Sequence, residues 1–260
     1  LMEGSGRTPK VLYADGSKKI LDHGVLVMEY LPGHTMDYHT ELMLAAPCLA
    51  DIHSVQIPES EEVLIHPQNP LKAILEECEE MFKVYLESPL GDEEKKIYIR
   101  ELLDLGWKRE AETRLESGYQ CCINTELNST NFLINGEGKS NYLIDWEKPL
   151  FGNPAQDLGH FLAPTTTFWK TDVILTSEEI EKFIDAYIKA VGNRFKTDMI
   201  REHTHAFIPI TCLRGITWCA MAWVQYQQPD KLIFNESTFK KLNAYLDMDF
   251  LKNIRGYLEP

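Results

Sequence analysis

The stretch from Cys121 to Glu147 constrains the fold more than any other part of the 260-residue chain. It holds a short apolar run, a polar turn, a second apolar run at residues 132–134, a Gly-containing turn and a third run at 142–144, which ends in Asp145. Short apolar runs bounded by turn residues predict strands, and the two runs around the Gly turn predict a hairpin. Polar side chains at the ends of such strands are typical of a site built on a rigid sheet.

Three polar residues in this stretch have the spacing of a phosphoryl-transfer site. Asn131 follows Glu126 by five residues, and Asp145 follows Asn131 by fourteen. Protein kinases place a base Asp before a metal-binding Asn at the same spacing, and a metal-binding Asp at the end of a later strand. The pattern therefore predicts a metal and phosphate site in which Glu126 orients or deprotonates a hydroxyl. The alternative is a Glu that only caps the loop while residues 128–130 form turn hydrogen bonds.

This segment resembles the catalytic centre of the aminoglycoside phosphotransferase and choline kinase family, the small-molecule branch of the kinase-like fold. That family shows a His-x-Asp-x-x-x-x-Asn loop, a strand ending in Asp-Trp-Glu or Asp-Phe-Glu, and a downstream Asp-Leu-(Ala or Gly) segment. By this resemblance Asn131 and Asp145 are the metal ligands. The resemblance also implies that Asp157 braces the catalytic loop and that Glu147 supports the site.

Two positions depart from the family pattern. Glu126 stands where the family has Asp, and Asn124 stands where His is usual. Glu126 keeps a carboxylate but is one methylene longer, and a displacement of about 1 Å in a reacting group can cost roughly a hundredfold in rate. The departures leave a second hypothesis open, a pseudokinase-like module that binds a nucleotide or small ligand without phosphoryl transfer.

The resemblance implies a function as well as a site. It predicts an ATP- and Mg²⁺-dependent kinase that phosphorylates a hydroxyl of a small molecule, with aminoglycosides, choline, ethanolamine, sugars and amino alcohols as the acceptors suggested by the family. The acidic balance of the chain, a net charge of −14, leans toward a cationic acceptor, although a generally acidic surface explains it equally well. The residues leave the acceptor, the choice between ATP and GTP, and the oligomeric state open.

The order of the predicted elements indicates an α+β fold with two lobes. Residues 1–31 are expected to form the remainder of a small N-terminal nucleotide-binding lobe and its hinge. Residues 32–260 are expected to form a mainly helical C-terminal lobe with the catalytic loop and substrate site. The phosphate-covering loop, strand Lys and helix Glu of kinases have no counterpart in the first 31 residues, so we expect the N-terminal lobe to be incomplete in this sequence.

The hinge is predicted where an apolar run at residues 25–29 meets a Pro-Gly break. Main-chain groups in such hinges contact the adenine ring, which makes Glu29, Tyr30 and Leu31 candidates for nucleotide binding by position. The alternative is an ordinary exit from a strand into a loop.

Apolar periodicity predicts the helices of the larger lobe. A Thr176-Ser-Glu-Glu179 capping box begins one of them, and Pro47 and Pro209 are expected to bend, restart or kink two others. The predicted helical ranges are 37–55, 70–88, 92–116, 196–227 and 238–255.

Aromatic residues recur in the long helix predicted at 196–227. Trp218, Trp223 and Tyr226 are expected to pack in the core, and the alternative is an aromatic cage for a quaternary ammonium group. Trp169, expected in a loop, is a candidate for lining a substrate cleft.

Composition excludes several other classes of function. The negative net charge argues against nucleic acid as a partner, because binding to phosphate backbones needs a basic surface. Six cysteines show no metal-binding spacing and indicate reduced core residues of a cytoplasmic protein. No signal peptide is visible, and the apolar runs are expected to be too short to span a membrane.

Overall fold

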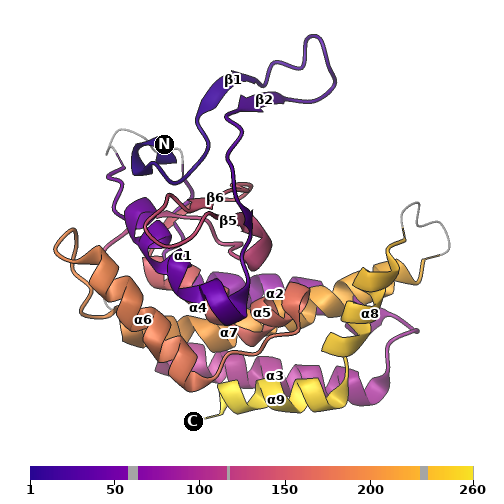
Figure 1. Ribbon diagram of the computed structural model, residues 1–260. Helices are drawn as coiled ribbons and strands as arrows, with labels where there is room; N and C mark the ends of the chain where they lie inside the picture. Colours follow the sequence, from indigo (N-terminus) through magenta and orange to yellow (C-terminus); the bar gives the residue numbers. More distant parts are fainter. Residues whose placement is uncertain (58–63, 116–117, 229–233, 260) are drawn as a thin grey trace.

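A computed structural model of the chain describes residues 1–57, 64–115, 118–228 and 234–259. Small sheets occupy the upper part of the molecule in Figure 1, and helices form the larger part below them. The strands are β1 (Val11–Asp15), β2 (Val25–Met28), β3 (His34–Thr35), β4 (Cys121–Ile123), β5 (Phe132–Ile134), β6 (Tyr142–Leu143) and β7 (Leu150–Gly152). The helices are α1 (Tyr38–His53), α2 (Pro70–Glu87), α3 (Glu93–Glu112), α4 (Pro154–Leu162), α5 (Pro164–Thr171), α6 (Ser177–Val191), α7 (Ile200–Tyr226), α8 (Glu236–Tyr245) and α9 (Met248–Leu258).

Three antiparallel pairings organise the strands. β1 and β2 form a hairpin that projects from the rest of the molecule (Figure 1), β5 pairs with both β3 and β6, and β4 pairs with β7. The chain leaves β2 and enters β3 through Gly33, which has φ +137° and lies so close to β5 that an added Cβ would be 2.9 Å from Leu133. Glycine is required there because the backbones approach closely at a positive φ. The predicted hairpin around the Gly turn is confirmed as β5–β6.

Most predicted helices are present, with corrected ends. α1 runs through Pro47 without restarting, and α7 runs through Pro209. The helix predicted at 238–255 is wrong as a single element, because the chain turns at Leu246 and Asp247 caps a separate helix, α9. The side chain of Asp247 accepts a hydrogen bond from the Asp249 amide, which favours a new helix start over continuation.

One predicted helix start is confirmed by its capping residues, and one predicted helix end is corrected. The capping box predicted at Thr176 and Glu179 is confirmed at the beginning of α6. α3 ends at Glu112, before the predicted end at residue 116, and residue 116 itself lies outside the described residues.

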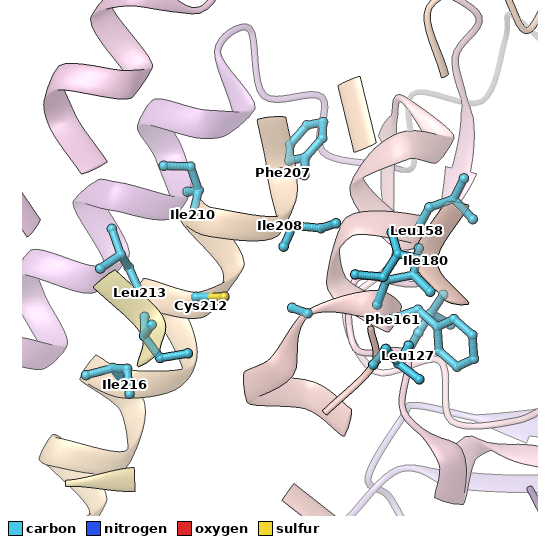
Figure 2. Close-up of a cluster of buried hydrophobic side chains, with 14 of the residues drawn as sticks. Leu127, Leu158, Phe161, Ile180, Phe207, Ile208, Ile210, Cys212, Leu213 and Ile216 are labelled. Carbon is cyan, nitrogen blue, oxygen red and sulfur yellow. The ribbon is translucent and has the colours of Figure 1, made fainter. Parts of the chain in front are cut away.

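The helix α7 lies at the centre of the larger lobe. Figure 2 shows Ile208 of α7 pointing toward Leu158 of α4 and Ile180 of α6. It packs closely against α4, where an added Cβ on Gly159 would lie 2.4 Å from the Cβ of Phe207. The buried side chains labelled in the figure are Leu127, Leu158, Phe161, Ile180, Phe207, Ile208, Ile210, Cys212, Leu213 and Ile216.

The same helix corrects one expectation about apolar runs. Among the described residues, α7 alone is long and apolar enough to cross a membrane by length and composition. Because 72% of its most apolar window is buried against neighbouring helices, packing in the core accounts for this composition. The six cysteines are all buried and unpaired, as expected for core residues.

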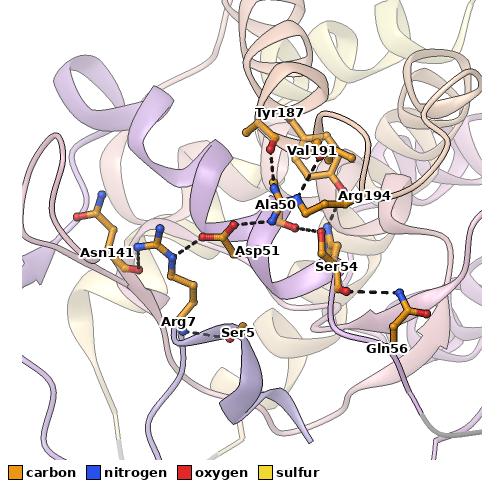
Figure 3. Close-up of polar contacts among 12 residues, drawn as sticks. Ser5, Arg7, Ala50, Asp51, Ser54, Gln56, Asn141, Tyr187, Val191 and Arg194 are labelled. Atoms are coloured by element: carbon orange, nitrogen blue, oxygen red, sulfur yellow. Dashed lines mark hydrogen bonds and ion pairs between the residues drawn. The ribbon is translucent and has the colours of Figure 1, made fainter.

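A polar network ties the beginning of the chain to the helical lobe (Figure 3). The Asp51 carboxylate on α1 accepts hydrogen bonds from Arg7 at 2.8 Å and from Arg194, beyond α6, at 2.6 Å. Arg7 also donates to the main-chain oxygen of Asn141, next to β6. These contacts connect three segments that are distant in sequence.

Candidate active site

The loop that carries Glu126 is held by a buried carboxylate. Asp157, on α4, accepts hydrogen bonds from the main-chain N–H groups of Asn124 at 2.8 Å and Thr125 at 2.7 Å. Its side chain has no solvent exposure. Thr125 has φ +70°, a left-handed conformation that is uncommon for a residue other than glycine. Asp157 therefore lies where the sequence prediction requires a residue that braces the loop.

A chain of hydrogen bonds continues from Asp157 into the core. His53 Nε2 lies 3.1 Å from Asp157 Oδ2, and His53 Nδ1 lies 2.8 Å from the hydroxyl of Tyr187. Burial raises the pKa of Tyr187 well above its ordinary value, so the hydroxyl keeps its proton. The contacts fit an imidazole whose Nδ1 accepts from the Tyr187 hydroxyl and whose Nε2 donates to Asp157. His53 is fully buried and packs in the core.

Asn124 connects the two halves of the predicted site. Its Oδ1 accepts from the main-chain N–H of Glu126 at 3.1 Å, and its Nδ2 donates to the main-chain oxygen of Asp145 at 2.7 Å. Asp145 has φ +67°, a second left-handed non-glycine residue. Asn124 thus fixes the backbone on both sides of the loop through one buried amide. A residue with both a donor and an acceptor is needed at this position.

Asn131 and Asp145 lie next to each other across β5 and β6. The main-chain oxygen of Asn131 accepts from the N–H of Ile144 at 2.8 Å, and Asn131 Nδ2 donates to the main-chain oxygen of Glu126 at 3.0 Å. The amide nitrogen is used inside the loop, and Oδ1 accepts only a long hydrogen bond of 3.4 Å from the Thr130 hydroxyl, so Oδ1 is the side-chain atom that could act as a ligand. The Asp145 carboxylate is exposed and has no hydrogen-bond partner among the described residues.

This pair fits a magnesium ion. Mg²⁺ binds oxygen ligands and is held by one or two protein groups together with phosphates and water. Within the described part of the chain, no group of three His, Cys, Asp or Glu side chains could hold a metal, so a site of the closed, all-protein type is not formed there. An exposed carboxylate and an amide oxygen that keeps one free lone pair meet the looser requirement of Mg²⁺.

The other predicted site residues occupy different surroundings. Glu147 is exposed, and its side chain has no hydrogen bond or ion pair within the described ranges, so its supporting role stays a prediction. In the predicted hinge, the main-chain N–H of Glu29 donates to the Lys10 oxygen at 2.8 Å and is used within the hairpin. Tyr30 is 93% exposed, and Leu31 follows it just before β3.

Glu126 opens into a cavity of about 290 Å³. The cavity lies among α2, α4, α5, α7 and α8, on one side of the loop. Its lining residues are Glu77, Glu126, Asn128, Lys148, His160, Thr165, Thr166, Trp169, Thr211, Arg214, Gly215, Trp218, Cys219 and Tyr245. A concave pocket with a few convergent polar groups is the usual form of a small-molecule site.

Arg214 on α7 links two carboxylates at this cavity. Its Nε lies 2.9 Å from Glu77 on α2, and its Nη2 lies 3.6 Å from Oε1 of Glu126. The Nζ of Lys148 lies 3.8 Å from the same Glu126 oxygen. Burial alone would lower the pKa of Arg214, but the hydrogen bond and charge of Glu77, with the charge of Glu126, raise it above its ordinary value. Arg214 is therefore a permanent cation beside the predicted base.

Sequence reasoning missed Glu77, Arg214 and Lys148. Glu77 lies in an acidic run on α2, a pattern typical of a solvated helix face. Arg214 did carry a signal, since it is the only Lys, Arg, Asp or Glu between Glu202 and the end of α7. An isolated charge in an apolar helix needs a partner or a function.

The aromatic residues divide between core and cavity. Trp223 packs edge-on against Tyr85 and donates to Asn243, which confirms core packing for this ring. Trp218 is 42% exposed and lines the cavity, so core packing is wrong for this member of the stripe. Trp169 lies on α5 and not in a loop, and it lines the cavity as predicted.

Comparisons with known proteins agree with the predicted fold. Solved structures with the same fold include a choline/ethanolamine kinase family protein from Mesorhizobium loti, at 14% identity and a TM-score of 0.60, covering 99% of this chain and 80% of that one. Choline kinase from Cryptosporidium parvum has 14% identity and a TM-score of 0.62, with coverages of 99% and 78%. Spectinomycin phosphotransferase, in complex with ADP and spectinomycin, has 15% identity and a TM-score of 0.62, with coverages of 98% and 79%.

These similarities confirm the predicted two-lobed kinase-like α+β fold, with a small sheet region and a mainly helical larger part. No curated protein sequence is significantly similar to the chain. The model of the phosphotransferase enzyme family matches residues 2–202, which is more than half of the sequence. The resemblance seen in the sequence is thereby confirmed: the chain belongs to the phosphotransferase enzyme family.

Proposed function

We propose that this protein is an ATP- and Mg²⁺-dependent kinase that phosphorylates a hydroxyl group of a small molecule. The observation that carries the proposal is the position of Glu126. Its carboxylate opens into a cavity, while Asn131 and Asp145 lie at the other end of the same hydrogen-bonded loop. An acceptor in the cavity and a nucleotide at the metal pair would approach each other across this loop.

In the proposed reaction, an acceptor oxygen attacks the γ-phosphorus of ATP. A bond forms between that oxygen and the phosphorus, the bond from the phosphorus to the bridging oxygen breaks, and ADP leaves with the electron pair. The hydroxyl proton passes to the carboxylate of Glu126. Since Arg214 and Lys148 both contact Oε1, we assign the proton to Oε2. Transfer of this kind depends mainly on positioning and charge stabilisation.

Asn131 and Asp145 are the residues that we propose to hold the metal. When bound, Mg²⁺ supplies charge neutralisation on the phosphates. The protein contributes the rigidity of the pair: Asn131 is fixed by its bond to the loop, and the Asp145 backbone is fixed by Asn124. Residues 1–31 are proposed to cover the nucleotide, with main-chain groups at residues 29–31 beside the adenine.

The test is thermal unfolding of the full chain with ATP, with and without Mg²⁺. Binding to the folded state at a hundred times the dissociation constant adds about 2.7 kcal/mol of stability. In a protein of this size this corresponds to a rise of roughly 5–11 °C in Tm. We expect the rise to require Mg²⁺ and to disappear in Asp145→Asn, whereas Asp185→Asn, an exposed site on α6, should keep it. No shift in the wild-type protein would refute the proposal.

A second function is favoured by one observation. Two cations contact the predicted base, and a carboxylate neutralised in this way suits a module that binds nucleotide without transferring phosphate. Glu126→Gln separates the two functions. In a kinase it abolishes ADP release with an acceptor and leaves the Mg²⁺–ATP stabilisation intact. If the wild-type protein is stabilised by Mg²⁺–ATP but releases no ADP with any small alcohol, the binding module is correct.

A further inference from the structure

The cavity beside Glu126 holds as many positive as negative side chains. Within the described residues, its acids are Glu77 and Glu126 and its bases are Lys148 and Arg214, two against two. Burial, and after it the charge of Arg214, lowers the pKa of His160 to about 3, so this imidazole is neutral at physiological pH. The lining therefore has a formal charge of zero, although the chain as a whole carries −14.

Both carboxylates of the cavity already have cationic partners. Arg214 contacts Glu77 at 2.9 Å and Glu126 at 3.6 Å, and Lys148 contacts Glu126 at 3.8 Å. A positively charged acceptor group that approached either carboxylate would lie beside the guanidinium or would have to displace it. A negatively charged group would meet Glu126 instead. Like charges placed together in a binding site lower affinity strongly.

The remaining walls present uncharged groups. Trp169 and Trp218 meet edge to face with ring centroids 5.3 Å apart. The Nζ of Lys170 lies 5.6 Å from the centroid of Trp169, so this ring already has a cation on one face. Threonine hydroxyls of α5 and α7 line the rest. Aromatic faces and hydroxyl groups suit the C–H surfaces and hydroxyls of a polyol or a zwitterionic hydroxy amino acid.

We propose that the acceptor is a small alcohol of zero net charge, and that Arg214 sets this preference. The inference rests on the proposed function, because it takes the cavity beside Glu126 as the acceptor site. A volume of about 290 Å³ lies at the lower end of the range for ligand pockets, which favours a compact acceptor. Arg214 acts on the acceptor through charge, as a cation that excludes other cations.

The test uses four small alcohols of different charge: ethanolamine, glycerol, L-serine and glycolate. Each is titrated into the full chain in the presence of Mg²⁺–ADP, and tryptophan fluorescence reports binding because Trp169 and Trp218 line the cavity. We expect glycerol or serine to bind at least about tenfold more tightly than ethanolamine and glycolate. This readout does not depend on turnover.

Two variants change the charge of the cavity in opposite directions. Arg214→Gln makes it negative and should shift the preference about tenfold toward ethanolamine, whereas Glu77→Gln makes it positive and should shift the preference toward glycolate. A purely structural role would change the affinity for all four probes by the same factor. Thermal unfolding of both variants shows whether they are folded.

Several results would overturn the inference. One is a wild-type protein that binds ethanolamine most tightly, and another is a pair of variants with unchanged selectivity. If Mg²⁺–ATP stabilises the protein but no probe changes the fluorescence, the inferred acceptor class is wrong while the kinase proposal stands. If Mg²⁺–ATP gives no stabilisation, the proposed function itself fails.

Discussion

Asp157→Asn should both destabilise the protein and disorganise the loop that carries Glu126. The buried carboxylate accepts from two main-chain N–H groups, at 2.8 and 2.7 Å, and lies 3.1 Å from His53 Nε2. An Asn side chain has one oxygen in place of two, and its NH2 group would face a donor. At least one buried donor is therefore left unpaired.

The magnitude follows from this set of contacts. A hydrogen bond to a charged group contributes about 1.5–3 kcal/mol, and removing one partner of a buried charged network costs about 3–5 kcal/mol. We expect the free energy of unfolding to fall by about 3–5 kcal/mol. For a protein of this size the Tm should fall by roughly 6–20 °C.

Urea unfolding followed by circular dichroism, together with ADP release, measures both consequences. Asp185→Asn is the matched control, since Asp185 is mostly exposed and pairs with Arg201 at the surface. Exposed pairs contribute about 0–1 kcal/mol, so this control should unfold near the wild-type midpoint. If Asp157→Asn also unfolds within about 1 kcal/mol of wild type, the carboxylate does not hold the loop and the reasoning fails.

Three further predictions concern packing, thiols and pH. In the same urea titration, Gly159→Ala should lower the free energy of unfolding by about 1–3 kcal/mol or more, because the new Cβ would lie 2.4 Å from Phe207. The control Gly256→Ala, which has open space around it in α9, should be neutral or slightly stabilising. Burial raises the pKa of the Cys48, Cys78, Cys122 and Cys212 thiols to about 12. A thiol reagent at pH 8 should therefore modify the native protein slowly, whereas in denaturant it should modify all six cysteines rapidly. Rapid labelling of the native protein would contradict this prediction. Folding lowers the pKa of His160 from an ordinary value of 6.5 to about 3, so the unfolded chain binds the proton first, and the free energy of unfolding falls by about 1 kcal/mol per pH unit as pH drops from 6.5 toward 3. This loss should be smaller in His160→Gln. An identical pH dependence in both proteins would show that the imidazole is not buried as a neutral group.

The sequence was sufficient for the parts of the site that lie close together along the chain. The spacing of Glu126, Asn131 and Asp145 is a local pattern, because a turn and a hairpin connect them, and it was enough to predict the family. The capping box at Thr176 was predictable for the same reason. Local hydrogen bonds depend on neighbouring residues, and these can be read directly from the sequence.

The tertiary structure alone decided what surrounds that pattern. Glu77 and Arg214 are separated by 137 residues and meet only because α2 packs against α7. Tyr187, His53 and Asp157 come from three helices and form one chain of hydrogen bonds. Periodicity shows which face of a helix is apolar, but it does not show which helix covers that face. The loop that resembles a kinase was therefore predictable, whereas the charge of the cavity beside it depends on how distant helices pack.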